Sequence, residues 1–424
     1  MAHAPSNSLK QHLTNRYHGF VIIFFGVFIT GANAFAADPT LAIHGFLSQG
    51  YIKSDKNNFL ADTEKGSFQI NEMGINFHKK ARENLNLGIQ LFARDLGPTD
   101  NDAVAVDWAY ADYHFRDYLG FRAGRIKNPV GLYHETRDVD MLRTAILLPE
   151  GVYTENIRDV VTATNGVSVY GDILTEDMGN LSYKVIMGTT NIRPDGGTAL
   201  AAAGSYVAVS DTDIGTNAAG AFWWTDPSDR LKIGGTLGLV SRLDLEGKTA
   251  EAVPGEIMGL PVDIPAGIDT ESRIRDILCW IVSAEFTSTI LTAAMEYRRL
   301  DTAYQAYLHY PGLPAPVVQE EDTRGEGYYA LVSHRFSGLF EAGYYYSVLY
   351  TDMTDRDGEE RNDAPFRAWK KDQALSFRFD LDENWIFKLE GHYIDGCAAM
   401  HNRMNPDGFH RYWYLFISKL SYSF

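Results

Sequence analysis

The sequence is poor in cysteine and in basic residues. Its 424 residues include only two cysteines, Cys279 and Cys397, which lie far apart and outside any CxxC pattern. This spacing supports neither a disulfide framework nor a zinc site. The chain has 38 lysines and arginines against 55 acids, which gives a formal net charge of −17. Because nucleic acid is bound through basic surfaces, we expect no nucleic-acid partner.

Long apolar runs and familiar hydrolase motifs are also missing. After Ala37, no apolar stretch approaches the roughly 20 residues that a membrane helix needs. If the chain enters a membrane, it must do so as a closed barrel, because only helices and closed barrels satisfy their backbone hydrogen bonds in lipid. The sequence contains no Gly-x-Ser-x-Gly, no His-Glu-x-x-His and no Walker-type loop. We therefore expect no catalytic residues, no cofactor and no metal site.

The N-terminus has the three regions of an export signal. Lys10 and Arg16 precede an apolar run from Phe20 to Ile29, and the tripeptide at 34–36 fits a signal-peptidase site. The run of about ten residues suits a signal peptide and is too short to span a bilayer. We expect residues 1–36 to be a cleaved signal peptide and residues 37–424 to form one transmembrane domain.

The residues that are abundant suit such a barrel. The chain has 38 Gly, 24 Tyr, 23 Phe and 7 Trp, with a mean hydropathy of −0.22. This combination is typical of an apolar outer band, a polar interior and rings of aromatic side chains. From Thr40 onward, segments of alternating polarity recur, and the clearest runs from Leu85 to Arg94. The expected strands lie near 40–53, 67–79, 84–94, 103–115, 119–126, 161–171, 180–190, 218–225, 230–243, 272–286, 289–300, 326–336, 339–351, 367–381, 384–395 and 411–424.

Connections between these segments alternate in length. Long polar ones, such as 127–160, 191–217, 244–271 and 301–325, alternate with tight ones such as 227–229. Outer-membrane barrels have long extracellular loops and short periplasmic turns, whereas a soluble antiparallel sandwich has no reason to sort its connections in this way. The sequence therefore predicts an all-β fold, a transmembrane antiparallel β-barrel of about 16 strands with long extracellular loops and short periplasmic turns.

The segment from Arg411 to Phe424 predicts a strand with one aromatic or apolar face and one face that becomes polar toward its end. With a terminal Phe and aromatics at alternate preceding positions, it resembles the closing strand of Gram-negative outer-membrane barrels. The resemblance implies that Tyr422 and Phe424 form a signal for the barrel-assembly machinery.

The third long connection, residues 127–160, is the candidate pore constriction. A barrel of about 16 strands leaves an aqueous channel, and a connection of roughly 30 residues is usually functional. We expect it to fold into the lumen, with its apolar run against the wall and its charges across a narrow gap. An outward loop packed on its neighbours or in a subunit interface is the alternative. The expected constriction residues are His134, Glu135, Arg137, Asp138, Asp140, Arg143 and Arg158.

Charged residues at alternate strand positions are expected to face the lumen. There they either set ion selectivity through their field or only solvate a water-filled pore. The expected wall residues are Arg94, Arg122, Lys184, Lys232, Glu296, Arg298, Glu341, Arg378, Lys388 and Glu390.

Two short motifs carry a more specific resemblance. Residues 124–133 read GRIKNPVGLY and residues 44–51 read HGFLSQGY, and both resemble a group of Gram-negative outer-membrane porins. The resemblance implies a homotrimer, in contact with outer-membrane lipid and lipopolysaccharide, through which small hydrophilic solutes and ions diffuse passively. Residues 149–151 match only part of the Pro-Glu-Phe-Gly-Gly stretch of enterobacterial porins, so their constriction residues cannot be transferred. A substrate-selective channel for an organic anion or a sugar, or an outer-membrane barrel hydrolase, remain the alternatives.

Overall fold

The computed structural model describes residues 40–424 except 98–102, 176, 205, 258–259 and 362–363. The chain divides into two units, Met1–Leu41 and Ala42–Phe424. The expected signal peptide, residues 1–36, lies outside the described residues, so its cleavage stays a prediction. The second unit holds nearly all of the described residues.

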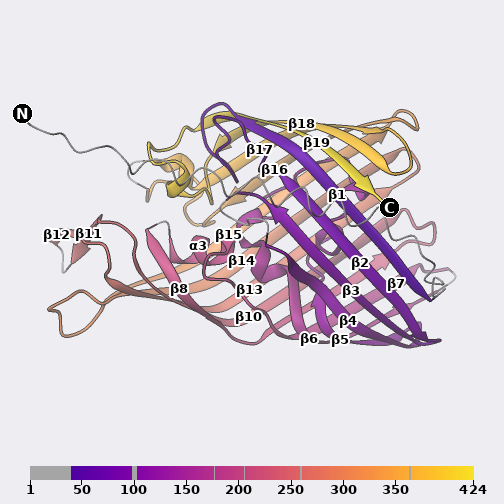
Figure 1. Cartoon of the computed structure of the whole chain (residues 1–424), viewed down its shortest axis with the longest axis horizontal. Helices are drawn as coiled ribbons and strands as arrows, with labels where there is room; N and C mark the ends of the chain where they lie inside the picture. Colours follow the sequence, from indigo (N-terminus) through magenta and orange to yellow (C-terminus); the bar gives the residue numbers. More distant parts are fainter. Residues whose placement is uncertain (1–39, 98–102, 176, 205, 258–259, 362–363) are drawn as a thin grey trace, which may run out of the picture. The chain divides into compact units, whose positions relative to one another are not determined.

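Within the described residues, seventeen strands form one sheet (Figure 1). They are β1 (Leu41–Ser54), β2 (Asn71–Arg82), β3 (Leu85–Asp95), β4 (Ala105–Arg116), β5 (Leu119–Lys127), β6 (Ala163–Ile173), β7 (Asn180–Thr189), β8 (Val207–Ile214), β9 (Asn217–Thr225), β10 (Leu231–Thr249), β13 (Asp269–Thr287), β14 (Leu291–Leu308), β15 (Val317–Arg335), β16 (Phe340–Tyr350), β17 (Trp369–Asp380), β18 (Trp385–Gly396) and β19 (Tyr412–Ser423). A separate hairpin follows β10 and consists of β11 (Val253–Ile257) and β12 (Leu260–Ile264).

The helices are short and lie in the connections. They are η1 (His134–Thr136), η2 (Asp140–Leu142), η3 (Glu155–Ile157), α2 (Arg158–Thr162), α3 (Gly197–Ala203), η4 (Pro365–Arg367) and η5 (Asn402–Met404). None of the helices in the described part of the chain is long and apolar enough to cross a membrane.

The sheet closes on itself because β1 pairs with both β2 and β19. In the β1–β19 pair, which is antiparallel, Phe46 lies opposite Ser423. β8 and β9 pair with β10 in one register, and Gly215 and Thr216 between them continue the hydrogen bonds to β10. When β8 and β9 are counted as one strand, sixteen strands surround the barrel. The prediction of an antiparallel barrel of about 16 strands is confirmed.

Side chains alternate between the outer and inner faces of the barrel, as the strand geometry requires. On β19, Tyr414 and Phe416 point outward and are 59% and 46% exposed, whereas Trp413 and Ile417 point inward and are fully buried. The inner face of this strand is thus more apolar than expected. The reason is that connecting loops cover it, so that Trp413 and Ile417 belong to a packed core rather than to a wet wall.

Each expected strand is present, but several strands are longer than the sequence pattern indicates. β10 and β13 extend into the two ends of the expected loop 244–271, with the β11–β12 hairpin between them. β14 and β15 extend through most of 301–325, and β8 and α3 lie within 191–217. The strand extensions carry charges that pair with one another, such as Arg242 with Asp244 at 2.7 Å and Arg275 with Asp244 at 2.5 Å. A bulge at Asp276, whose φ is 52°, also breaks the alternation. These segments resembled loops because their many charges and the bulge interrupt the alternation of apolar and polar residues.

Candidate functional site in the barrel interior

The connection between β5 and β6, residues 128–162, lies inside the barrel, and we call it the inward loop. Its backbone amides donate hydrogen bonds to inward-facing side chains on the opposite wall. Leu132 donates to Glu296 on β14 at 2.9 Å, and Gly151 to Ser347 on β16 at 2.8 Å. Ile146 donates at 2.7 Å to Glu390 on β18. The loop therefore crosses the lumen.

The middle of the inward loop is apolar and packs against the wall. Ile146 and Leu147 join a core that includes Trp413 and Ile417 of β19. Leu148 packs with residues of β13, β14 and β15, and Ala145 with residues of β16 and β17. Burying an isoleucine or leucine side chain contributes about 1.5–3 kcal/mol. The apolar middle of the loop therefore packs against β1 and against the wall strands from β13 to β19.

Two arginines of the inward loop are buried in ion pairs. Arg137 donates to Glu155 at 2.5 Å, and Arg158 donates to Asp138. Arg94 of β3 also binds Glu155, at 2.9 Å. Burial tends to raise the pKa of Asp138, but the charges of Arg158 and Lys127 outweigh it and hold that pKa well below its ordinary value. We expected these groups to face one another across a gap; they touch and are hardly exposed.

A second buried cluster ties the loop to the last two strands. Asp140 accepts hydrogen bonds from Lys388 of β18 at 2.9 Å and from Ser421 of β19 at 2.7 Å. Burial alone would raise the pKa of Asp140. The positive charges of Lys388 and Lys419 have the larger, opposite effect, so the pKa of Asp140 lies below its ordinary value. Glu150 of the loop similarly pairs with Lys370 of β17. Removing one member of such a buried pair is strongly destabilising, because its partner is left as an uncompensated charge.

Most of the expected wall residues contact the inward loop. Their loop partners are Glu155 for Arg94, Glu135 for Lys184, the Leu132 and Tyr153 groups for Glu296, the Val152 carbonyl for Arg298, Thr144 for Glu341, the Met141 carbonyl for Arg378, Asp140 for Lys388, and the Ile146 and Leu147 amides for Glu390. Arg122 instead lies over the ring of Tyr170 and pairs with Asp112, and Lys232 lies over the ring of Trp223.

The remaining expected constriction residues differ in exposure. His134 is 1% exposed, whereas the side chain of Glu135 is 46% exposed. Arg143 donates to the carbonyls of Arg137 and Ile146, at 2.5 and 3.4 Å. Their role as a constriction stays a prediction, but Glu135 is the member with most access to water.

Three tyrosines were missed by the sequence reasoning. Tyr153 and Tyr329 donate to the carboxylate of Glu296, and Tyr133 donates to Glu285 at 2.8 Å. The sequence analysis gave these tyrosines no role of their own. Only the crossing of the loop to β14 shows that they hold it, so no local signal was available.

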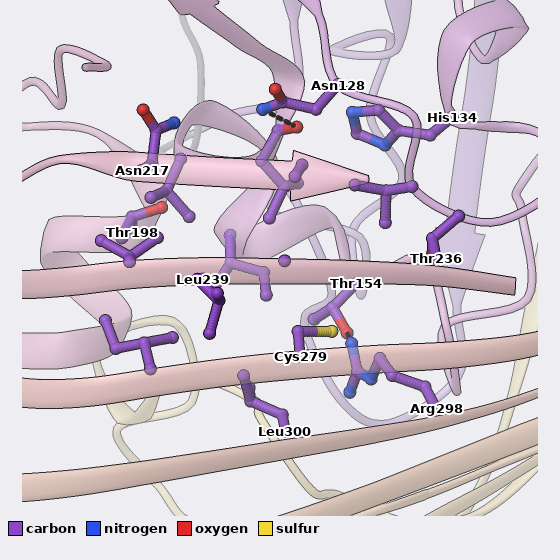
Figure 2. A pocket seen from close by; sticks show the side chains of 18 of the residues that line it. Asn128, His134, Thr154, Thr198, Asn217, Thr236, Leu239, Cys279, Arg298 and Leu300 are labelled. Carbon is purple, nitrogen blue, oxygen red and sulfur yellow. Dashed lines mark hydrogen bonds between the residues drawn. The ribbon is translucent and has the colours of Figure 1, made fainter. Parts of the chain in front are cut away.

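Two cavities remain on the side of β9 to β17. The first, of about 340 Å³, is lined by the inward loop, α3 and the strands β9, β10, β13 and β14 (Figure 2). The second, of about 370 Å³, lies nearer the short turns, between loop residues 141–148 and the strands β13 to β17. Tyr153 lines the first and Tyr133 the second, with ring centroids 6.0 Å apart. These tyrosines lie where the two cavities approach each other.

No protein-family model matches the sequence of this chain. An uncharacterized protein of Aquifex aeolicus (strain VF5) is 30% identical over 100 residues, and the match spans 23% of this chain and 22% of that protein. The chain thus covers less than a quarter of this relative.

Solved outer-membrane proteins match almost the whole chain in structure. The anion-selective porin from Comamonas acidovorans has a TM-score of 0.51 at 11% identity, covering 91% of this chain and 99% of that one. OmpF of Salmonella typhi in complex with daunomycin has a TM-score of 0.51 at 11% identity, covering 91% and 97%. The channel DcaP of Acinetobacter baumannii has a TM-score of 0.50 at 10% identity, covering 91% and 97%. The chain therefore has the fold of the Gram-negative outer-membrane porins, a closed antiparallel barrel of 16 strands.

Proposed function

We propose that this chain is an outer-membrane porin, a water-filled channel for the passive diffusion of small hydrophilic solutes and ions. The observation that carries the proposal is the closed 16-strand barrel whose interior is crossed, but not filled, by the inward loop. Barrels of this size enclose an aqueous channel, whereas eight-stranded barrels fill with side chains.

The outer face of the barrel supports a place in the membrane. Large apolar side chains are exposed on many strands, among them Val185 on β7, Phe222 on β9, Ile233 on β10, Met295 on β14 and Phe416 on β19. Exposed apolar surface of this extent marks contact with a lipid or a partner. Contact with outer-membrane lipid and lipopolysaccharide accounts for it.

Aromatic rings gather at the end of the barrel that carries the short turns. Phe340 lies 5.5 Å from Phe336 and 5.2 Å from Phe379, and Trp385 lies 4.7 Å from Tyr422. Aromatic rings border the lipid-facing band of outer-membrane barrels at both membrane interfaces. Because the short turns of such barrels face the periplasm, we assign this end to the periplasmic interface.

In this proposal the inward loop forms the constriction, and the charged residues of the loop and the wall have two different roles. Asp138, Asp140 and Arg158 hold the loop through buried pairs. The charged residues that line the second cavity meet passing solutes. These are Arg143, Glu285, Arg335, Glu341 and Arg378. Bases outnumber acids among them, so we propose a modest preference for anions.

Reconstitution of the purified protein into planar lipid bilayers tests the channel function. We expect stepwise, ohmic conductance and a reversal potential in a salt gradient that indicates a modest anion preference. Protein that shows the heat-dependent gel migration of a folded barrel but gives no conductance steps would contradict the proposal. Measurable ester or peptide hydrolysis by the same preparation would favour the barrel hydrolase instead.

Assembly and oligomeric state are separate proposals. We propose a homotrimer, and cross-linking of the detergent-solubilised protein tests it, with monomers alone as the contrary result. We further propose that Tyr422 and Phe424 bind the barrel-assembly machinery; Phe424 is 52% exposed, and its amide bonds to the Gly45 carbonyl at 3.0 Å. Phe424→Asp should lower outer-membrane yield severalfold without changing single-channel conductance. A normal yield would remove this role.

A further inference from the structure

The first cavity has an apolar body and a cationic end. Its apolar lining comes from the inward loop, β10, β13 and β14. The residues that define it are Val152, Ile157, Val160, Leu243, Ile277 and Leu300. A volume of about 340 Å³ lies at the lower end of the range for small-molecule pockets, and a mostly apolar lining with a few polar groups is their usual composition.

Arg298 lies at the cationic end and has no counter-charge. Its side chain is 5% exposed and donates to the Val152 carbonyl at 3.2 Å and to the Thr154 hydroxyl at 3.1 Å. Among the described residues, no acid forms an ion pair with Arg298, and its Nε has no hydrogen-bond partner. Figure 2 shows its guanidinium beside Cys279 and Thr154. Because arginine stays charged and an unpaired buried charge is unfavourable, an anion at this point would be stabilised.

The contrast with the other buried arginines of the interior is informative. Arg94 and Arg137 share Glu155, and Arg158 pairs with Asp138. The carboxylates that neutralise these arginines belong to the protein itself. Arg298 is equally buried, but only neutral groups of the protein accept its hydrogen bonds. A carboxylate that neutralises Arg298 would therefore have to come from a ligand.

His134 lines the same cavity and offers a second donor. It is 1% exposed, and its Nδ1 lies 3.4 Å from Nη1 of Arg137. A guanidinium only donates, so Nδ1 accepts and the ring proton sits on Nε2. That Nε2 has no partner among the described residues. Burial and the charge of Arg137 hold the pKa of His134 well below its ordinary value, so the ring is neutral.

From the pairing of Arg298 with this apolar lining, we propose that the first cavity binds a small apolar monocarboxylate. The carboxylate accepts hydrogen bonds from Arg298, and the apolar body lies against Val152, Cys279 and Leu300, which line the cavity next to the guanidinium. This inference rests on the proposed channel function, since it names a solute class that the channel retains as it passes. A free phosphate would satisfy the arginine but not the apolar lining, and an apolar cation would be repelled by Arg298.

Calorimetric titration of the folded, detergent-solubilised protein with benzoate, acetate and benzyl alcohol tests the ligand class. Benzoate should bind about tenfold or more tightly than benzyl alcohol, which has the ring but no charge, because a hydrogen bond to a charged group is lost. It should also bind about tenfold or more tightly than acetate, which has the charge but no ring. No detectable benzoate binding, or equal affinity for benzoate and either analogue, would overturn the inference. This comparison needs no variant.

Two variants test the site. Arg298→Gln removes the charge and should weaken benzoate binding about tenfold or more. Arg299→Gln is the matched control, because Arg299 is the next residue of β14, pairs with Asp301 at 2.8 Å and does not line the cavity. It should bind benzoate as the unmodified protein does. Equal affinities for the two variants would place binding elsewhere.

Bilayer conductance of the same preparation separates this inference from the proposed function. Conducting protein that does not bind benzoate contradicts the monocarboxylate site and leaves the porin proposal in place. Folded protein that binds benzoate but never conducts contradicts the porin proposal and leaves a binding site without a channel.

Discussion

The two sides of the barrel interior differ in how much of the lumen they close. Along β1, β18 and β19, inward-facing Ile52, Trp413 and Ile417 pack with Ile146 and Leu147 of the inward loop. A smaller cavity of about 160 Å³ lies on this side, between loop residues 138–141 and the ends of β1 and β19. Along β9 to β17, the two cavities separate the loop from much of the wall. The inward loop is held on both sides, but it leaves the larger cavities along β9 to β17, so we expect solutes to pass along that side.

The largest effect should come from releasing the loop on the closed side through Glu390→Ala. Its carboxylate accepts the Ile146 and Leu147 amides at 2.7 and 2.9 Å, as well as a hydrogen bond from Ser376. Two buried N–H groups left without an acceptor cost about 2–6 kcal/mol together. We expect a matching loss in the free energy of unfolding in urea and a larger, noisier single-channel conductance. Glu383→Ala, in an exposed short turn, serves as the control; equal behaviour of the two variants would contradict the fastening role.

A pair of leucines in the same loop tests the apolar contact. Leu147 is 9% exposed and packs on the closed side, whereas Leu142 is 65% exposed. Leu147→Ala should lower the free energy of unfolding by about 2–5 kcal/mol, since it leaves a cavity, and Leu142→Ala should change it by less than about 0.5 kcal/mol. Urea titrations of both variants provide the measurement. Similar losses would mean that the loop is not seated on β19 as described.

Sequence patterns predicted the barrel because the relevant signal is local. Alternation with a period of two and the sorting of connections by length can both be recognised without knowing which strands pair. The sequence patterns missed strand segments that are held by pairing with a neighbouring strand and show little alternation of their own. Examples are β8 and the extension of β10 to Thr249, which pair with each other. The inward-facing side of strands such as β18 followed from the same alternation.

The partners and the burial of the site residues could not be predicted in this way. Asp140 and Lys388 are 248 residues apart in sequence yet 2.9 Å apart in space. Arg137 and Arg298 look equivalent as arginines expected in the lumen, but one has Glu155 beside it and the other has only neutral acceptors. Such differences depend on how the loop crosses the barrel, for which the sequence offers no periodic signal.

Acidification should weaken the buried ion pairs that hold the inward loop. Asp138 and Asp140 have pKa values held below the ordinary 3.8, because the neighbouring cations outweigh the effect of burial. A carboxylate with a lowered folded-state pKa stabilises the fold above its unfolded pKa and loses that contribution as pH falls through the folded value. The free energy of unfolding from these groups should be constant from pH 8 to about 5 and should decline below about pH 4.

The size of the acid effect is on the order of 1–2 kcal/mol for each carboxylate. Urea titrations at successive pH values measure it. Asp138→Asn should flatten the decline, whereas Asp62→Asn, which alters an exposed pair with Lys65, should keep the profile of the unmodified protein. An unchanged profile for Asp138→Asn would mean that its buried pairs do not contribute to the stability of the loop.

The smallest expected effect concerns the open side and separates two arginines that the sequence could not distinguish. Arg143 lines the second cavity, whereas Arg137 is 3% exposed and bound to Glu155. Arg143→Ala should shift the permeability ratio toward cations by less than about fivefold, and loss of its hydrogen bonds to two loop carbonyls should lower the free energy of unfolding by about 1–3 kcal/mol. Arg137→Ala should lower the free energy of unfolding by more, about 3–5 kcal/mol, because buried Glu155 loses one of its two closest cations. Reversal potentials in a salt gradient and urea titrations of both variants measure these outcomes. If Arg137→Ala changes selectivity and Arg143→Ala does not, then passing ions respond to Arg137, which also lines the first cavity, and the second cavity does not set the selectivity.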